Sequence, residues 1–107
     1  GLLRAGCEKE AVSLAEATVR MIDKAGTFDE FYLTTDGSAQ GGLDYLWTAA
    51  DYALLLIEDL LGISYDGATG RLTVCPRLKA NFRLENLALP TGDKVTVTCV
   101  DGVVRLN

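Results

Sequence analysis

The first part of the chain repeats apolar side chains with the period of an α-helix. From about Leu2 to Ala25, charged side chains lie opposite an apolar stripe formed by Ala11, Leu14, Ala15, Thr18, Val19, Met21, Ile22 and Ala25. Gly26 follows, and glycine most readily adopts the left-handed turn that closes a helix. The pattern therefore predicts one amphipathic helix that buries one face and ends at Ala25.

The residues from Tyr45 to Leu61 form a second run, which is apolar almost all the way round. We expect Asp44 to cap this helix at its N-terminus and Gly62 to close it. The polar positions in the run are Thr48, Asp51, Glu58 and Asp59. A helix of this kind is buried on most sides, and one partner helix does not cover it. Its surplus apolar surface is expected to meet the following strands, another copy of the chain, or parts of a larger protein.

Beyond Gly62 the pattern changes from helical to alternating, which predicts β-strands. One hairpin is expected around the turn sequence D-G-A-T-G, and another around Asp101-Gly102, a dipeptide typical of two-residue turns. Val95, Val97 and Cys99 share the face expected to be buried. The expected strands are Ile63–Tyr65, Arg71–Pro76, Phe82–Leu84, Leu87–Leu89, Lys94–Val100 and Val103–Leu106.

Together these patterns predict an α+β fold in which an antiparallel helical hairpin precedes a small antiparallel β-sheet. The hairpin is expected over residues 1–62 and the β part over residues 63–107. A chain of 107 residues has room for one hydrophobic core, so both parts are expected to pack as a single domain over residues 1–107.

The connector between the two helices is the strongest candidate for a binding site. Residues 26–44 are too many for an ordinary helix–helix link, and the aromatic residues of the connector argue for an ordered loop. Carboxylates set among aromatic rings suit a neutral polyhydroxylated ligand, because rings stack on a sugar face and carboxylates accept its hydroxyls. The expected partner is a carbohydrate, and the candidate binding residues are Phe28, Tyr32, Asp44 and Trp47.

Composition excludes several other classes of protein. The net charge of −5 argues against nucleic-acid binding, and no apolar run is long enough to span a membrane. The chain has no histidine, which excludes His-based triads and His-ligated metals, and we expect neither a metal nor a cofactor. Cys7, Cys75 and Cys99 lack metal-ligand spacing, so a cytoplasmic protein with reduced thiols is expected.

Three segments in order resemble the end of a six-hairpin glycosidase, the (α/α)6 toroid shared by trehalases, mannosyl-oligosaccharide glucosidases and rhamnosidases. The first is the acidic aromatic sequence Phe28-Asp29-Glu30-Phe31-Tyr32. The second is the glycine-rich approach to a tryptophan, namely Asp36-Gly37, Gly41-Gly42 and Trp47-Thr48-Ala49-Ala50. The third is Gly62-Ile63 followed by G-R-L-T-V-C-P-R-L, which looks like the passage into a C-terminal β-domain.

The resemblance implies that Glu30 is the general base of an inverting glycoside hydrolase. Inversion needs a second carboxyl group, the general acid, roughly 6.5–9.5 Å away. In the family this acid lies on an earlier hairpin, so the chain would be a C-terminal fragment that is inactive alone. Leu43-Asp44-Tyr45-Leu46 departs from the family, which more often has a Phe and a small residue before the tryptophan.

A non-catalytic interpretation stands beside this one. Glu30 is then a solvated loop carboxylate, Asp29 and Asp36 are turn residues, and Tyr45 and Trp47 belong to a core. The chain would be an oligomerisation or carbohydrate-binding module. In either interpretation its expected partner is a second copy or a missing N-terminal helical portion, because the surplus apolar surface of the second helix favours a partner that covers it.

Overall fold

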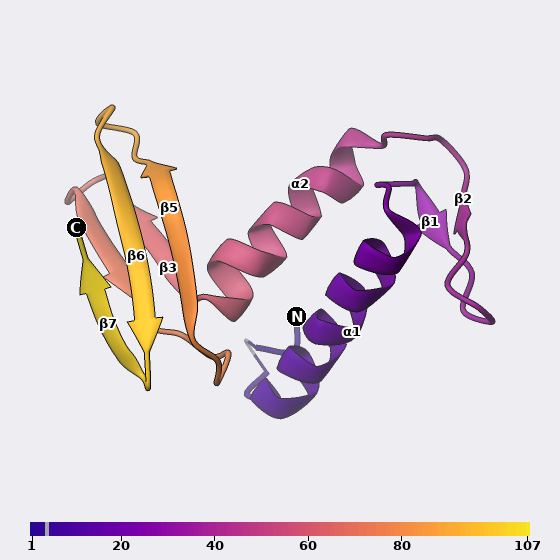
Figure 1. Ribbon diagram of the computed structural model, residues 1–107, viewed down its shortest axis with the longest axis horizontal. Helices are drawn as coiled ribbons and strands as arrows, with labels where there is room; N and C mark the ends of the chain where they lie inside the picture. Colours follow the sequence, from indigo (N-terminus) through magenta and orange to yellow (C-terminus); the bar gives the residue numbers. More distant parts are fainter. Residues whose placement is uncertain (4) are drawn as a thin grey trace. The chain divides into compact units, whose positions relative to one another are not determined.

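The computed structural model describes residues 1–3 and 5–107, and their contacts form two compact units. We call Gly1–Leu60 the helical unit and Leu61–Asn107 the strand unit. The boundary lies next to Gly62, where the sequence pattern changes from helical to alternating. An antiparallel helical hairpin precedes antiparallel strands, which confirms the predicted α+β class (Figure 1). The packing of both parts as one domain stays a prediction.

Helix α1 spans Glu8–Ala25 and ends where the sequence predicts. Gly26 adopts the left-handed conformation, with φ 72°, and its N–H donates to the Ile22 carbonyl oxygen at 2.9 Å. The helix begins later than expected because Gly6 is also left-handed, with φ 79°, so turns precede Glu8. Arg4, which the predicted helix included, lies outside the described residues.

Helix α2 spans Leu46–Leu54 and continues into a π-helical segment, η1, over Leu55–Leu60. The expected cap is wrong: Tyr45 occupies the N-cap position without a side-chain capping bond, and Asp44 is left-handed with φ 52°. The wider π turn was not predicted either. No residue of α2 is buried within the described residues, and Leu60 is the buried residue of η1.

The connector between the helices is an antiparallel ribbon that includes strands β1 (Phe31–Tyr32) and β2 (Ala39–Gln40). The pairing extends beyond these short strands toward both helices. The Tyr45 N–H donates to the Phe28 carbonyl oxygen at 2.6 Å, and the Glu30 N–H donates to the Gly42 carbonyl oxygen at 3.1 Å. Residues 28–45 therefore form an ordered arm held at the ends of α1 and α2.

The strand unit contains two antiparallel sheets. The first pairs β3 with β4, and the second has the order β5-β6-β7. Ile63, Val97 and Cys99 are its buried apolar residues. The strand bounds are Ile63–Asp66 for β3, Arg71–Val74 for β4, Phe82–Ala88 for β5, Lys94–Val100 for β6 and Val103–Leu106 for β7.

One turn and one strand in the strand unit show which predictions held. Asp101 and Gly102 both have positive φ, at 50° and 79°, as the predicted two-residue turn between β6 and β7 requires. The two short strands expected around residues 82–89 are instead one strand, β5. Its register shifts between Leu84 and Leu87, where Asn86 is left-handed with φ 56°.

The assignment of the chain to the C-terminal part of a six-hairpin toroid is wrong. The described residues hold two α-helices, one of them continued by η1, and three small antiparallel sheets. An (α/α)6 toroid is instead built from six helical hairpins around a barrel. Within the described residues, neither helix combines the length and the apolar character needed to cross a bilayer.

Candidate functional site

Glu30, the candidate general base, lies on the surface of the ribbon. Its Oε2 accepts a hydrogen bond from the Gly42 N–H at 3.3 Å. A Cβ placed on Gly41 would press on the Glu30 side chain, at 2.7 Å from Oε2. The absence of a side chain at Gly41, with φ 86°, therefore lets the Glu30 carboxylate fold across the opposite arm of the ribbon.

Two of the candidate binding residues hold the base of the ribbon in place. The Phe28 ring meets the Tyr52 ring of α2 edge-on, with centroids 5.3 Å apart. The Tyr32 hydroxyl donates to the Thr27 carbonyl oxygen at 2.7 Å and accepts from the Asp29 N–H at 3.1 Å. The Phe28 ring and the Tyr32 hydroxyl, which a sugar would need, are therefore engaged in contacts within the helical unit.

The other two candidates belong to an exposed aromatic surface at the start of α2. Trp47 is 74% exposed, and its ring lies edge-on to the Tyr45 ring with centroids 6.0 Å apart. Leu43 and Leu46 beside them are 79% and 76% exposed, and Asp44 is exposed too. We call Leu43, Asp44, Tyr45, Leu46 and Trp47 the aromatic platform. The placement of Tyr45 and Trp47 in a core is not seen in the helical unit.

Asp29, which the sequence suggested as a turn residue, is instead a buried carboxyl group. It is 1% exposed, and neither side-chain oxygen has a hydrogen-bond partner in the part of the chain that the structure describes. Its backbone is well connected, because the Thr48 hydroxyl donates to the Asp29 carbonyl oxygen at 2.8 Å. A buried polar group without a partner costs free energy, and such groups in folded proteins call for an explanation.

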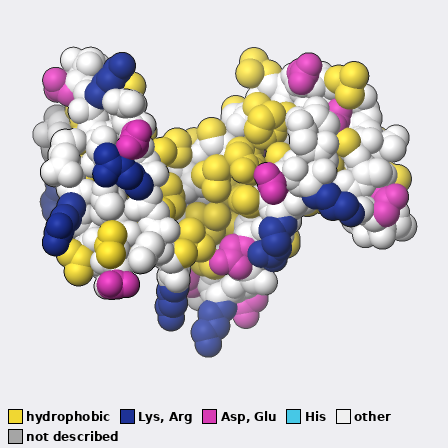
Figure 2. Space-filling view, viewed as in Figure 1, with side chains coloured by type: hydrophobic (Ala, Val, Ile, Leu, Met, Phe, Trp, Pro, Cys, Tyr) yellow, Lys and Arg dark blue, Asp and Glu magenta, His cyan; other side chains and the backbone are white. Residues whose placement is uncertain are grey.

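A hollow runs between α1 and the continuous helix formed by α2 and η1. Its volume is about 800 Å³, and we call it the hairpin groove. Hydrophobic side chains gather along this side of the hairpin in Figure 2, with acidic side chains beside them. The groove is lined by Gly1, Leu2, Leu3, Ala11, Val12, Leu14, Ala15, Thr18, Ile22, Thr48, Asp51, Tyr52, Leu55, Asp59 and Leu60. None of the residues predicted to form the site lines it.

A second apolar surface of α2 lies outside the groove. Leu46, Ala50, Ala53 and Leu54 are exposed and follow helical spacing, which places them on one side of the helix. We call these four residues the outer stripe. It carries no charge, and Leu46 and Leu54 are 76% and 51% exposed.

The strand unit has a smaller hollow, of about 560 Å³, at one end of its three-stranded sheet. The Asn81 Oδ1 at this end accepts a hydrogen bond from the Asp101 N–H at 2.8 Å. The hollow is lined by Pro76, Leu78, Lys79, Ala80, Asn81, Cys99, Asp101 and Gly102. Its polar groups are the Lys79 amine, the Asn81 amide, the Asp101 carboxylate and the Cys99 thiol.

Charge is divided unevenly between the two units. Residues 1–60 hold four Lys or Arg and eleven Asp or Glu, a net charge of −7, whereas residues 61–107 hold six and four, a net charge of +2.

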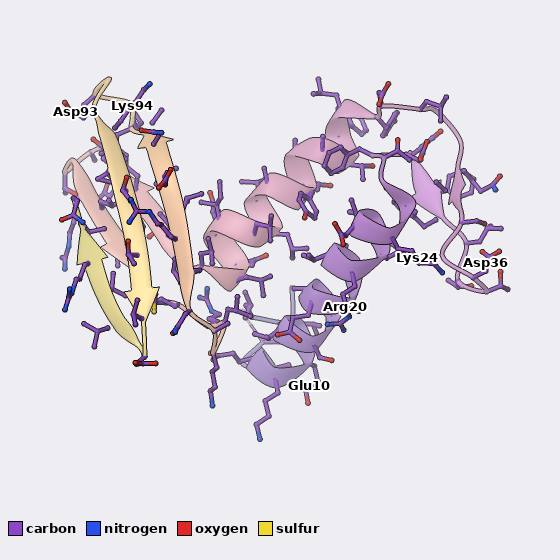
Figure 3. The ribbon with its side chains drawn as sticks, viewed as in Figure 1. Glu10, Arg20, Lys24, Asp36, Asp93 and Lys94 are labelled. Atoms are coloured by element: carbon purple, nitrogen blue, oxygen red, sulfur yellow. The ribbon has the colours of Figure 1, made fainter. Side chains whose placement is uncertain are left out.

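Hydrogen bonds from the Ser38 N–H and hydroxyl hold the pKa of Asp36 below its ordinary value, with a smaller contribution from Lys24 nearby (Figure 3). Asp36 is thus a turn residue, as its sequence context suggested.

No known protein family matches the chain, and neither a curated protein nor a solved structure matches it. This finding and the architecture overturn the six-hairpin glycosidase assignment. The role of general base came to Glu30 from that assignment and has no other support. Within the described part of the chain, no cluster of three Cys, Asp or Glu side chains has the geometry to hold a metal ion.

Proposed function

We propose that the chain is a non-catalytic association module, which forms a homodimer through the outer stripe of α2. One observation carries the proposal: the most apolar helix of the chain has no buried residue within its own unit. Apolar area removed from water stabilises association by about 25 cal/mol per Å². Exposed Leu46 and Leu54 therefore favour a partner that covers them.

The chemistry of the outer stripe favours a second copy as that partner. The stripe is free of charge within a unit whose net charge is −7, so it offers a basic or acidic partner nothing to pair with. A twofold dimer places the same surface against itself, and an apolar stripe is complementary to its own copy. Ala50 and Ala53 between the two leucines let the helices approach closely. The patch is small, so we expect a weak dimer.

Sedimentation velocity over a concentration series tests the dimer with a matched pair of variants. Ala50→Glu puts a charge on the outer stripe, and Ala17→Glu puts the same charge on an exposed position of α1 outside the groove. We expect a dimer with a Kd of roughly 10–100 μM, weakened at least tenfold by Ala50→Glu and unchanged by Ala17→Glu. A wild-type monomer at several hundred micromolar, or equal loss in both variants, would contradict the proposal.

A second candidate function, carbohydrate binding, is favoured by the aromatic platform. An exposed tryptophan with a ring neighbour and a carboxylate at Asp44 offers a stacking face and a hydroxyl acceptor. Affinity electrophoresis in gels that contain soluble polysaccharides provides the test. Retardation that Trp47→Ala abolishes and Phe31→Ala preserves would support it. Mobility unchanged by every polysaccharide would leave the module without a sugar ligand.

We also propose a reducing compartment, the cytoplasm, for this module. Cys7, Cys75 and Cys99 are all unpaired, which suits a compartment where thiols stay reduced. Fractionation of cells that express the native gene would test this localisation.

A further inference from the structure

The hairpin groove is long, open and unfilled by the helices around it. Its lining on α1 runs from Ala11 to Ile22, which is about 17 Å at 1.5 Å per residue. Ala11 and Ala15 keep the α1 wall shallow, and Tyr52 and Leu55 form the opposite wall. An elongated trough between two helices, lined mostly by apolar side chains, fits the side chains of a third helix.

The charged side chains that line the groove favour an occupant of positive charge. Asp51 lines the groove and is exposed, and no hydrogen bond or ion pair joins its carboxylate to the described residues. Asp59 lines the same wall further along, and no Lys or Arg lines the groove among the described residues. The helical unit as a whole has a net charge of −7. A basic partner therefore meets attraction here, and an acidic one meets repulsion.

We propose that the hairpin groove binds an amphipathic helix of a partner protein, which carries Lys or Arg beside its apolar face. The apolar face supplies the affinity and the basic side chain beside Asp51 supplies the selectivity. The groove shares no residue with the outer stripe, so this binding and the homodimer fail or succeed independently.

A designed peptide serves as the probe, because the natural partner is unidentified. The probe is a fluorescein-labelled 14-residue helix of Leu and Lys, with Leu at helical spacing on one face. Its control replaces every Lys with Glu. Fluorescence anisotropy with the full chain at low salt should give saturable binding of the Lys peptide, at least tenfold tighter than the Glu peptide. Binding of the Lys peptide should weaken as salt is raised.

Two matched pairs of variants locate the binding. Ala11→Trp fills the groove, whereas Ala17→Trp adds the same ring to the exposed face of α1. Asp51→Asn removes a carboxylate from the groove, whereas Asp44→Asn removes one from the aromatic platform and changes the net charge by the same amount. We expect about a tenfold loss of affinity for Ala11→Trp and a three- to tenfold loss for Asp51→Asn, with both controls within twofold of wild type.

Several results would overturn the proposal. These are equal binding of the Glu peptide, equal losses in Asp51→Asn and Asp44→Asn, and no saturable binding at all. Displacement of the Lys peptide by submillimolar dodecylammonium at one molecule per chain would assign the groove to a small amphiphile instead. Circular dichroism checks that each variant folds. If Ala11→Trp does not fold, the aspartate pair and the Glu peptide still decide the outcome.

Discussion

At the scale of single residues, the buried carboxyl group of Asp29 makes folding less favourable. Its carboxyl group is buried without a hydrogen-bond partner among the described residues, which is unfavourable. The backbone on either side explains how the position is held: the Asp29 N–H donates to the Tyr32 hydroxyl, and its carbonyl oxygen accepts from Thr48. The ribbon and α2 therefore hold the main chain of Asp29 in place. Its side chain is buried as a result and loses its hydrogen bonds to water.

Asp29→Ala is expected to stabilise the fold. Removing a buried polar group without a partner recovers its desolvation cost, about 1–3 kcal/mol, less the cost of the small cavity left behind. We expect the free energy of unfolding in urea to rise by about 1 kcal/mol. Asp51→Ala, at an exposed position, should change it by about 0.5 kcal/mol or less. Destabilisation by Asp29→Ala beyond the control would mean that the carboxyl group makes a stabilising contact, and would contradict this prediction.

The positions at which glycine turns the backbone could be predicted from the sequence, and the burial of Asp29 could not. Gly26 closes α1 and Asp101-Gly102 forms a tight turn, because glycine adopts positive φ wherever the chain requires it. Gly62 was predicted as a helix stop. It also lies so close to the Cys75 carbonyl that a Cβ would overlap it, a contact between distant residues that no local pattern reveals.

At the scale of elements, the main surprises lie in α2 and in the connector. A π-helical segment keeps the apolar pattern of an α-helix, so η1 is invisible to periodicity, and its wider turn depends on packing. Strands β1 and β2 have two residues each, too few to show an alternation. The ribbon depends on hydrogen bonds between its arms, such as Tyr45 to Phe28, and these join residues far apart in the sequence.

The β3–β4 turn contains a carboxylate whose titration can be followed. The Thr69 hydroxyl donates to Asp66 Oδ2 at 2.6 Å, and the Ala68 N–H donates to Oδ1 at 2.9 Å. These hydrogen bonds, that of Thr69 first, lower the pKa of Asp66 below its ordinary value of 3.8. The stabilisation they give is complete above this ordinary value and is lost as the pH falls through the lowered pKa.

Thr69→Val removes the hydroxyl and keeps the shape of the side chain. We expect the pKa of Asp66 to rise toward 3.8, because the largest cause of its lowering is gone. NMR titration of the side-chain carboxyl carbon measures this shift. Asp36 in the same spectra is the internal control, since Ser38 sets its pKa independently of Thr69. A lowered pKa of Asp66 that survives the substitution would assign the effect to the backbone N–H groups alone.

At the scale of the whole molecule, charge and apolar surface act in opposite directions. Each copy carries a net charge of −5, so two copies repel one another, while the uncharged outer stripe draws them together. Salt screens the repulsion between exposed charges over about 10 Å at 0.1 M and leaves apolar contact largely intact.

Raising the salt concentration should therefore strengthen the homodimer. We expect the Kd from sedimentation to fall about two- to fivefold between 50 mM and 500 mM NaCl. The groove peptide should show the opposite trend, because its binding includes an attraction between opposite charges. A dimer that dissociates as salt is raised would indicate an interface built on ion pairs, and would contradict assembly through the outer stripe.

The site was less predictable than the fold. The sequence identified the ordered connector and the surplus apolar surface of α2, since both follow from residue type and spacing. It did not identify the hairpin groove, whose walls come from both helices and depend on how far apart they stand. The resemblance to a glycosidase rested on short segments such as Asp36-Gly37, and glycine turns of this kind recur in unrelated folds.

The accessibility of the three thiols offers a practical handle on this molecule. Cys75 is exposed, Cys7 is half-buried and Cys99 is buried in the sheet. Maleimide dyes should therefore modify Cys75 first, which places a single fluorophore on the strand unit and leaves both surfaces of the hairpin unaltered. A chain tagged in this way can report self-association and peptide capture by energy transfer without any engineered cysteine.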